Sequence, residues 1–464
     1  MIPAVEWARE LAGALVDAAR KAGADAGDAA VSLGSALSAS AREGTIEELT
    51  RSSWRAAGLR VIVGGRLGFV SSADAPLDAR SIRALAESAL SLARVATPSD
   101  DNVLPPAVPD AGAAAREAAL CTWDDATAEA GPDWATAHAL AMDAALRRVP
   151  GVAGTKDVSA TTRRGVLALA TSSGFVGAQR GTAASLSCTA IAEDGGRKQS
   201  ERDWDAARAL AALRPPEELA RVAALRTLAR VGARALPPTR APVIVEPSVA
   251  RGFLAALLSA ASGAAVARRR SWLCELLGEA VLPPGVSVID DANIVGGLAS
   301  RAYDGEGVLT PRTVIVDEAG VLRTLLTDAH SAHRLGVPLT GHAARSATTL
   351  PAPGSTNTLV TGGSGTLDDL IASTRRGLLV TSLLGHGPDA VTGDYSRGAA
   401  GFWIEDGAIA FPVDGLSIAG RMIDMLRGID RVAADAESRA ALRAPSLRFA
   451  ELAIGGRESA PDSR

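Results

Sequence analysis

The sequence predicts an α+β protein with two domains, an N-terminal α/β domain and a β-rich C-terminal domain. In the first half of the chain, apolar residues at helical spacing alternate with strand-like runs, which indicates an antiparallel sheet with flanking helices. In the second half most runs are short and strand-like. The prolines Pro237–Pro238 end a predicted helix and separate the two patterns. We therefore assign residues 1–236 and 237–455 to the two domains and expect a disordered tail at 456–464.

Helices and short strands alternate in the predicted N-terminal domain. Gly64–Gly65 separates two strand-like runs, 58–63 and 67–72, and a two-glycine turn between such runs predicts a tight hairpin. From about residue 116 onward the domain contains a central meander of short strands, which we place between residues 152 and 204. The predicted helices are 3–22, 81–95, 132–149 and 215–235, the last of them charged and solvated.

A hairpin and a buried helix characterise the predicted C-terminal domain. Asp406–Gly407 separates the apolar run 402–404 from a second run at 408–413, and an Asp–Gly dipeptide in this setting predicts a hairpin turn. Residues 248–270 predict one helix that is apolar and rich in small residues. Small side chains allow close backbone packing, so we expect this helix to lie deep in the domain.

Composition excludes several classes of protein. The formal net charge of −4 gives no overall basic field that would recruit nucleic acid directly. The three cysteines, Cys121, Cys188 and Cys274, are far apart and include no CxxC pair, which argues against a disulfide framework and fits a reducing compartment. No uninterrupted apolar stretch approaches the ~18 residues of a membrane span. We expect a soluble, cytoplasmic protein that does not associate with a membrane.

A polar loop directly before the hairpin is the first candidate site. Thr392, Asp394, Ser396 and Arg397 lie on a glycine-rich segment mounted on a rigid hairpin, an arrangement common in binding sites. The simpler interpretation is that Asp394 and Arg397 pair and fix the loop. Ser396 could also act as a nucleophile with His386 as base, but no GxSxG motif surrounds it.

Other polar clusters leave their roles open. Asp304 and Glu306 are paired carboxylates on a glycine-bracketed loop, where they could serve acid–base chemistry or hold the loop. His330, His333 and His342 lie close in sequence, and an HxxH pair on one helix could bind a metal, although surface histidines explain the pattern more simply. The glycine-rich segment 362–366 favours a capped turn over a phosphate loop because it lacks the P-loop lysine.

Several long motifs in order resemble those of the TldD/PmbA family, and specifically its PmbA or TldE-like branch. The most specific is GHGPDAVTGDYSRGAAGFWIEDGAIAFPV at residues 385–413, followed by SIAG at 417–420. The segment 297–336, beginning GLASRAYDGEGVLT, resembles the central signature of the family, and TGHA at 340–343 follows it. The hairpin segment 58–74, GLRVIVGGRLGFVSSAD, resembles the N-terminal motif.

This resemblance implies a fold, an activity and a partner. It implies a barrel-like C-terminal domain and a cytoplasmic assembly in which a TldD-type chain and a TldE-type chain form a heteromeric zinc metalloprotease that cleaves unfolded peptides. In the TldD branch the zinc ligands include an HExxxH motif, whose glutamate activates a zinc-bound water. The sequence contains no HExxxH. By resemblance, Ser259, Ala260 and Ala264 stand at its His, Glu and His positions, and the family's C-terminal cysteine falls near Ala444.

The sequence therefore predicts a non-catalytic, TldE-like subunit that holds no metal or other cofactor of its own. Methyl groups cannot bind zinc and a neutral serine is a poor ligand, so we expect the zinc in the TldD-type partner. Asp304, Glu306 and the Thr392–Arg397 loop are expected to shape the cavity or contact the peptide or partner. Two alternatives stay open: a stand-alone peptide-binding or scaffold protein without proteolytic activity, and an independent hydrolase that uses Ser396 or the histidines.

Overall fold

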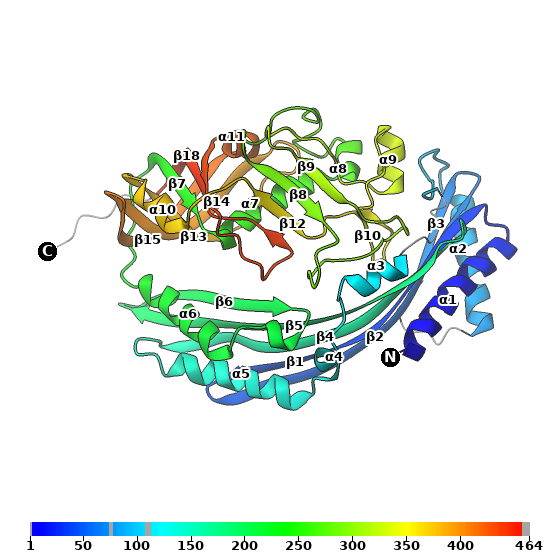
Figure 1. Ribbon diagram of the computed structural model, residues 1–464, viewed down its shortest axis with the longest axis horizontal. Helices are drawn as coiled ribbons and strands as arrows, with labels where there is room; N and C mark the ends of the chain where they lie inside the picture. The colour runs from blue at the N-terminus through cyan, green and yellow to red at the C-terminus, as the bar shows by residue number, and fades with distance from the viewer. Residues whose placement is uncertain (1, 74–77, 107–112, 457–464) are drawn as a thin grey trace.

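The computed structural model describes residues 2–73, 78–106 and 113–456, and it confirms the α+β class. A six-stranded antiparallel sheet forms one layer, and the C-terminal domain lies against one face of it (Figure 1). The predicted disordered tail lies outside the described residues except for Gly456. No helix in the described part of the chain combines the length and apolar character needed to cross a membrane.

The N-terminal sheet is built from strands much longer than the sequence suggests. The predicted run 58–63 is only the end of the 19-residue strand β2, and the predicted meander of short strands between residues 152 and 204 consists of three long strands, each paired along its length with its neighbours. Gly64 and Gly65 have φ angles of 53° and 70°, which confirms the predicted hairpin turn. The strands are β1 (Ala26–Arg42), β2 (Thr45–Val63), β3 (Arg66–Ser72), β4 (Gly154–Thr171), β5 (Val176–Asp194) and β6 (Arg197–Ala207), in the spatial order β3-β2-β1-β4-β5-β6.

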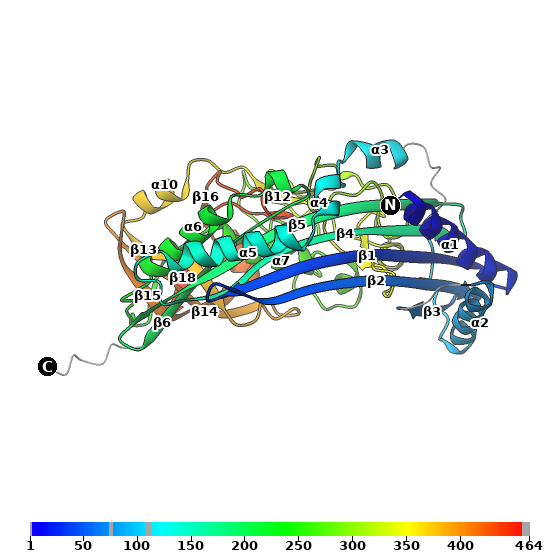
Figure 2. The same ribbon diagram turned by 90° about the horizontal axis from the view of Figure 1, so that it is seen from below.

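Four helices cover one face of this sheet (Figures 1 and 2). Odd-numbered residues of β1, such as Val31 and Leu37, point toward them, as strand alternation requires. The predicted solvated helix at 215–235 is shorter and half buried, because Leu219 and Ala223 pack into the sheet core. The covering helices are α1 (Ile2–Lys21), α2 (Ala79–Val95), α5 (Pro132–Arg147) and α6 (Pro216–Ala229); α3 (Ala113–Ala119), α4 (Asp125–Glu129) and the 3₁₀ helix η1 (Leu210–Ala212) are short.

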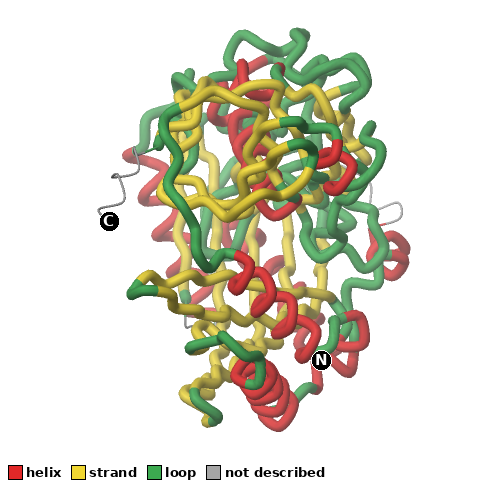
Figure 3. Tube along the Cα trace, turned by 90° about the vertical axis from the view of Figure 1, so that its left-hand side faces the viewer, coloured by secondary structure: helices red, strands yellow, loops and turns green. Residues whose placement is uncertain are grey.

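The C-terminal domain contains a closed five-stranded barrel, which confirms the barrel-like expectation. Figure 3 shows its strands as a ring above the sheet. Asp406 and Gly407 have φ angles of 48° and 78°, so the predicted hairpin between β14 and β15 is also confirmed. The barrel strands are β7 (Thr239–Val245), β13 (Arg376–Leu384), β14 (Asp394–Glu405), β15 (Ala408–Arg421) and β18 (Leu447–Gly455), with β16 (Ile429–Val432) paired to β18.

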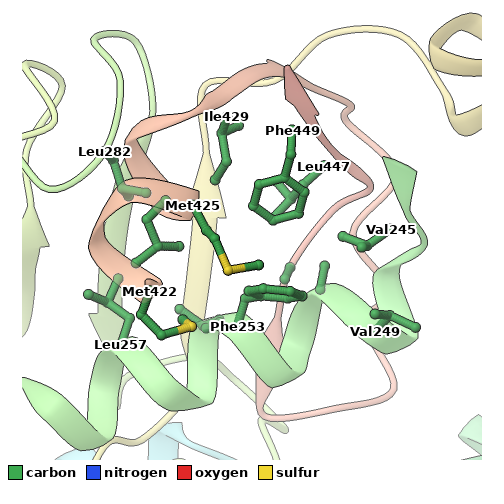
Figure 4. Close-up of a cluster of buried hydrophobic side chains, with 14 of the residues drawn as sticks. Val245, Val249, Phe253, Leu257, Leu282, Met422, Met425, Ile429, Leu447 and Phe449 are labelled. Carbon is green, nitrogen blue, oxygen red and sulfur yellow. The ribbon is translucent and has the colours of Figure 1, made fainter. Parts of the chain in front are cut away.

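Helix α7 (Pro247–Ala260) packs against the inward-facing side chains of the barrel. Phe253 and Phe449 are almost fully buried, with ring centroids 5.1 Å apart. Met422 and Met425 of α11 (Met422–Arg427) close one side of this core (Figure 4). The abundance of small residues in α7 lets the helix fit between strands, which agrees with the predicted buried helix.

The predicted helix 248–270 is wrong in its second half. Helix α7 ends at Ala260, and a separate short helix, α8 (Gly263–Ala267), follows. The amide of Gly263 donates to the carbonyl of Leu326 at 2.7 Å, so a neighbouring segment takes the donor that a continuing helix would use. Apolar periodicity cannot show such competition from a distant segment.

Smaller elements complete the C-terminal domain. A four-stranded sheet comprises β8 (Ser287–Asp291), β9 (Arg312–Val316), β12 (Thr358–Thr361) and β17 (Leu442–Arg443), and β10 (Ala343–Ala344) pairs with β11 (Ala352–Pro353). Helix α9 (Ala329–Leu335) contains His330 and His333, two of the three candidate metal ligands. Helix α10 (Leu367–Ala372) begins with a capping box between Thr366 and Asp369, so the glycine-rich segment before it ends in the capped turn that the sequence favours.

Candidate functional site

A cavity of about 540 Å³ lies where α7 gives way to α8. Ser259, at the end of α7, and Ala264, in α8, both line it. The two positions that the family resemblance assigns to histidine ligands therefore share one cavity wall. Ala260, at the glutamate position, is 5% exposed and does not line the cavity. The other lining residues include Ser262, Arg268, Arg270, Leu326, Gly354, Ser355 and Leu442.

The donor atoms at this cavity do not fit a zinc ion. Zinc in proteins is held by thiolate, imidazole or carboxylate groups, usually four ligands counting water. The cavity instead presents hydroxyl groups, a methyl group and two exposed arginines, which would repel a cation. Ala444 is buried in the barrel core two residues beyond Leu442, which lines the cavity. In the described residues, no group of three or more His, Cys, Asp or Glu side chains is arranged to hold a metal.

Asp304 fixes the backbone of its own loop. Its carboxylate accepts hydrogen bonds from the amides of Glu306 at 2.9 Å, Val308 at 3.0 Å and Ala343 at 3.0 Å. The side chain is only 2% exposed. Burial raises the pKa of Asp304, although these amides oppose the shift. The residue thus ties its loop to the TGHA segment through Ala343.

Glu306 connects that loop to the N-terminal sheet. Its Oε1 atom accepts from Nη2 of Arg60 on β2 at 2.9 Å, and its Oε2 atom accepts from the amide of Ala329 at the start of α9 at 2.7 Å. Arg60 also pairs with Asp28 on β1, and Arg345 donates to the same Asp28 at 2.7 Å. We call Asp28, Arg60, Glu306 and Arg345 the interdomain charge network. Its side chains are 4% exposed or less.

Burial and pairing shift the pKa values in this network in opposite directions. Burial raises the pKa of Glu306 to about 7, and Arg60 offsets only part of that effect. Burial also acts to raise the pKa of Asp28, but Arg345 and Arg60 together outweigh it and hold that pKa below its usual range. Burial would lower the pKa of Arg60, but its two carboxylate neighbours reverse the effect and raise it. Of the two carboxyl groups, Glu306 is therefore the one with a pKa near neutrality.

Sequence reasoning found Asp304 and Glu306 but missed their partners. Asp28, Arg60 and Arg345 come from three distant segments, and spacing carries no signal that joins them. Arg60 lies inside the 58–74 motif that resembles the family, which was the one available hint. Whether Asp304 and Glu306 also shape peptide binding stays a prediction.

The prediction of a loop at Thr392–Arg397 is wrong from Asp394 onward, because Asp394, Ser396 and Arg397 belong to strand β14; Thr392, Asp394 and Ser396 are exposed. Thr392 and Asp394 bond to each other at 2.7 Å, and Thr392 also bonds to Asp389 at 3.2 Å. Asp394 and Arg397 form no ion pair in the described structure, so the simple pairing interpretation is wrong. Strand alternation on β14 explains this: Asp394 and Ser396 point outward, whereas Arg397 lies on the inner face and donates to the carbonyl of Leu383 at 3.4 Å. A role in binding stays a prediction.

The three histidines do not form a common site. His330 and His333 on α9 contact Asp101, the first through its carbonyl and the second through its carboxylate, each at 3.0 Å. His342 is buried elsewhere and pairs with Asp290 at 3.1 Å. The metal interpretation therefore lacks the geometry it needs among the described residues. The contacts instead dock the segment around residue 101 onto α9.

Fold and cavity together define a class of protein: a long-stranded sheet, covered by helices on one face, that carries a helix-filled barrel on the other. Three domain models of the PmbA/TldA metallopeptidase family match this chain: domain 1 at residues 27–93, the central domain at 125–231 and the C-terminal domain at 238–456. The chain belongs to the PmbA/TldD family and is metalloprotease-like.

Individual relatives agree along nearly the whole length. The Metalloprotease PmbA of Escherichia coli O157:H7 is 33% identical over 437 residues, 93% of this chain and 92% of that protein. A Metalloprotease PmbA homolog of Haemophilus influenzae is 33% identical, covering 95% of this chain and 94% of the homolog. A crystal structure of a candidate DNA gyrase modulator from Bacteroides thetaiotaomicron has a TM-score of 0.86 at 25% identity, covering 97% and 98% of the two chains. TldE from Thermococcus kodakarensis shares the fold, with a TM-score of 0.81 at 22% identity and coverage of 95% and 99%.

Proposed function

We propose that this chain is a non-catalytic, TldE-like subunit of a cytoplasmic TldD-type zinc metalloprotease that cleaves unfolded peptides. One observation carries the proposal. Ser259 and Ala264 line a cavity of about 540 Å³ on an intact family fold, yet neither offers a zinc ligand. Neither the hydroxyl of Ser259 nor the methyl of Ala264 can replace the zinc ligands that hold a metal-activated water, and no glutamate is among the described lining residues. The catalytic metal then belongs to a TldD-type partner.

Two exposed apolar side chains, Leu384 and Val391, flank the predicted polar segment and support contact with a partner; we refer to these two residues as the apolar patch. Leu384, at the end of β13, is 65% exposed, and Val391 is 54% exposed. Leu384 pairs with Gly398 on β14, so the patch adjoins the Thr392–Arg397 segment. Large exposed apolar side chains rimmed by polar groups are a common feature of protein interfaces. The patch and this segment together form the surface at which we place the TldD-type chain.

Co-expression with a TldD-type paralogue tests the proposal. The two chains are expected to purify together and to hydrolyse an unfolded peptide, whereas this chain alone does not. Replacing the glutamate of the partner's HExxxH by glutamine should abolish the activity. The proposal would be contradicted if the two chains did not co-purify, or if the partner were equally active with and without this chain. Either result would favour a stand-alone peptide-binding or scaffold protein.

A charge placed in the apolar patch tests the proposed surface separately. The double variant Leu384→Glu/Val391→Asp should fold normally and fail to co-purify with the partner, because both side chains are solvent-exposed in the isolated chain. Leu225→Glu on α6 is the matched control, since Leu225 is 51% exposed but lies on a different surface. If both variants co-purify equally, the interface lies elsewhere.

A further inference from the structure

A second cavity, of about 420 Å³, lies between the free face of the N-terminal sheet and the C-terminal domain. Its volume is within the ~300–1,000 Å³ range of small-molecule sites. It shares no lining residue with the cavity at the end of α7, and the proposed function does not use it. Its described walls include residues of β1, β4 and β5, among them Ser32, and the loop segments 299–301, 303–305 and 345–346.

The floor of this interdomain cavity is apolar and aromatic. Leu167 and Leu169 of β4 alternate toward it, on the sheet face opposite the covering helices. The indole of Trp54 lies across Gly34, where a Cβ atom would overlap the ring, so the sheet makes room for this side chain. The guanidinium of Arg163 stacks 4.6 Å from the centroid of the Trp54 ring. The floor can thus receive an apolar group next to a positive charge.

The opposite wall holds Arg301, a partly buried guanidinium with no ion-pair partner in the described part of the chain. The Nε and Nη2 atoms of Arg301 are buried and have no hydrogen-bond partner among the described residues. No carboxylate among the described residues lies within ion-pair distance of Arg301. Burial lowers the pKa of Arg301, with only partial opposition from the more distant Asp304 and Asp290. Buried guanidinium groups are ordinarily paired, so this arrangement leaves a place for an anion.

Two further arginines line the same cavity and add positive charge to it. Arg345 has a fully buried side chain and uses Nη1 for Asp28, whereas its Nε and Nη2 atoms have no partner in the described structure. Arg208 donates to the carbonyls of Leu298 at 2.6 Å and Gly297 at 3.2 Å, and contacts no described carboxylate. Asp304 is the single carboxylate among the described lining residues, and backbone amides already occupy both of its oxygens.

We propose that the interdomain cavity binds a carboxylate joined to an apolar group, with Arg301 and Arg345 receiving the carboxylate and Trp54 the apolar part. A guanidinium presents a planar fork of donors that matches the two oxygens of a carboxylate. The C-terminal residue of a peptide and a free small acid carry this chemistry equally. The site is formed within one chain, so it does not depend on a catalytic partner.

Isothermal titration calorimetry of the full-length chain tests the site. The probes are the peptide N-acetyl-Ala-Ala-Leu with a free carboxylate, the same peptide as its C-terminal amide, N-acetylleucine, and inorganic phosphate. The free-acid peptide should bind at least roughly tenfold more tightly than the amide, as expected for charged hydrogen bonds. N-acetylleucine binding as tightly as the peptide assigns the site to free small acids, and weaker binding assigns it to peptide ends. Equal binding of acid and amide, binding of phosphate alone, or no binding at millimolar concentration overturns the proposal.

Variants locate the binding within the chain. Arg301→Gln should weaken binding of the free-acid peptide roughly tenfold or more and leave binding of the amide unchanged. The substitution removes the positive charge but keeps a side chain of similar size. Arg375→Gln is the matched control because that side chain is 93% exposed and lies outside the cavity. Ser32→Leu fills the cavity floor without touching a charge and should abolish binding even if Arg301→Gln does not fold. Unchanged affinity in Ser32→Leu, or in a folded Arg301→Gln, contradicts the assignment.

Discussion

Two regions of this protein differ in the polar groups that they contain, and the comparison shows what the proposed non-catalytic role depends on. The cavity at the end of α7, where the family resemblance places zinc ligands, offers a hydroxyl at Ser259 and a methyl at Ala264. The interdomain charge network is dense in carboxylates and guanidiniums, but Arg60 and Glu306 bond to each other across the domains. Charged residues thus connect the two domains, whereas the positions expected to hold zinc have no side chains suited to bind it.

The largest expected effect on stability comes from removing Arg60, which contacts both carboxylates of the interdomain charge network. Arg60→Ala leaves Asp28 and Glu306 buried without the guanidinium that joins them, and removal of one partner from such a cluster costs about 3–5 kcal/mol of stability. Urea unfolding followed by circular dichroism measures the loss. Arg268→Ala, an exposed arginine at the other cavity, is the control and should leave the unfolding midpoint unchanged. Equal stability of the two variants would mean that the network does not hold the domains together.

A smaller effect should appear in the pH dependence of stability. The pKa of Glu306 is about 7 in the folded chain against an ordinary value of 4.5. Between these pH values the folded state keeps a proton that the unfolded state releases, so this carboxyl's contribution to the free energy of unfolding falls as pH rises. The shift corresponds to a change on the order of 3 kcal/mol across the window.

Glu306→Gln isolates that contribution because glutamine does not titrate. The stability of the original chain relative to the variant should decrease from pH 4.5 to pH 7. The pKa of Asp28 is held below the usual 3.8, and Asp304, whose pKa burial raises, is present in both proteins, so its own contribution is removed by the comparison. Urea unfolding of both proteins at a series of pH values provides the measurement. A difference that stays constant across this range would show that Glu306 is ionised throughout.

The smallest effect is expected at Ser396 on β14. Ser396→Ala removes an exposed hydroxyl with no side-chain hydrogen bond in the described structure, so stability should change by less than about 0.5 kcal/mol. Peptide hydrolysis by the assembled complex should also be unchanged, because the proposed function assigns Ser396 no catalytic role. If the variant lost activity but kept its stability and its assembly with the partner, the result would favour the alternative of an independent hydrolase that uses Ser396.

Local sequence signals predicted local structure well. The Asp406–Gly407 and Gly64–Gly65 turns follow from the need for positive φ at both turn positions, which few other residue pairs meet. The buried character of α7 followed from its small, apolar side chains. These features depend on neighbours in the sequence, so composition and spacing suffice to find them.

Interactions between distant segments escaped prediction. The break after Ala260 depends on the carbonyl of Leu326, and the partners of Glu306 come from separate strands and loops. His342 was grouped with His330 because the two are close in sequence. In the structure His342 is buried beside Asp290 of β8, and no sequence motif links these two residues. The fold class could therefore be predicted, whereas the charge network and the second cavity could not, and the position of the degenerate site stays a prediction.

The most direct test of the central claim is the zinc content of the purified chain, measured by elemental analysis after removal of loosely bound metal. The absence of ligands at Ser259, Ala260 and Ala264 predicts well under one zinc per chain, and about one zinc per assembly once a TldD-type partner is bound. One tightly held zinc in the isolated chain would contradict the account and would require a different set of ligands.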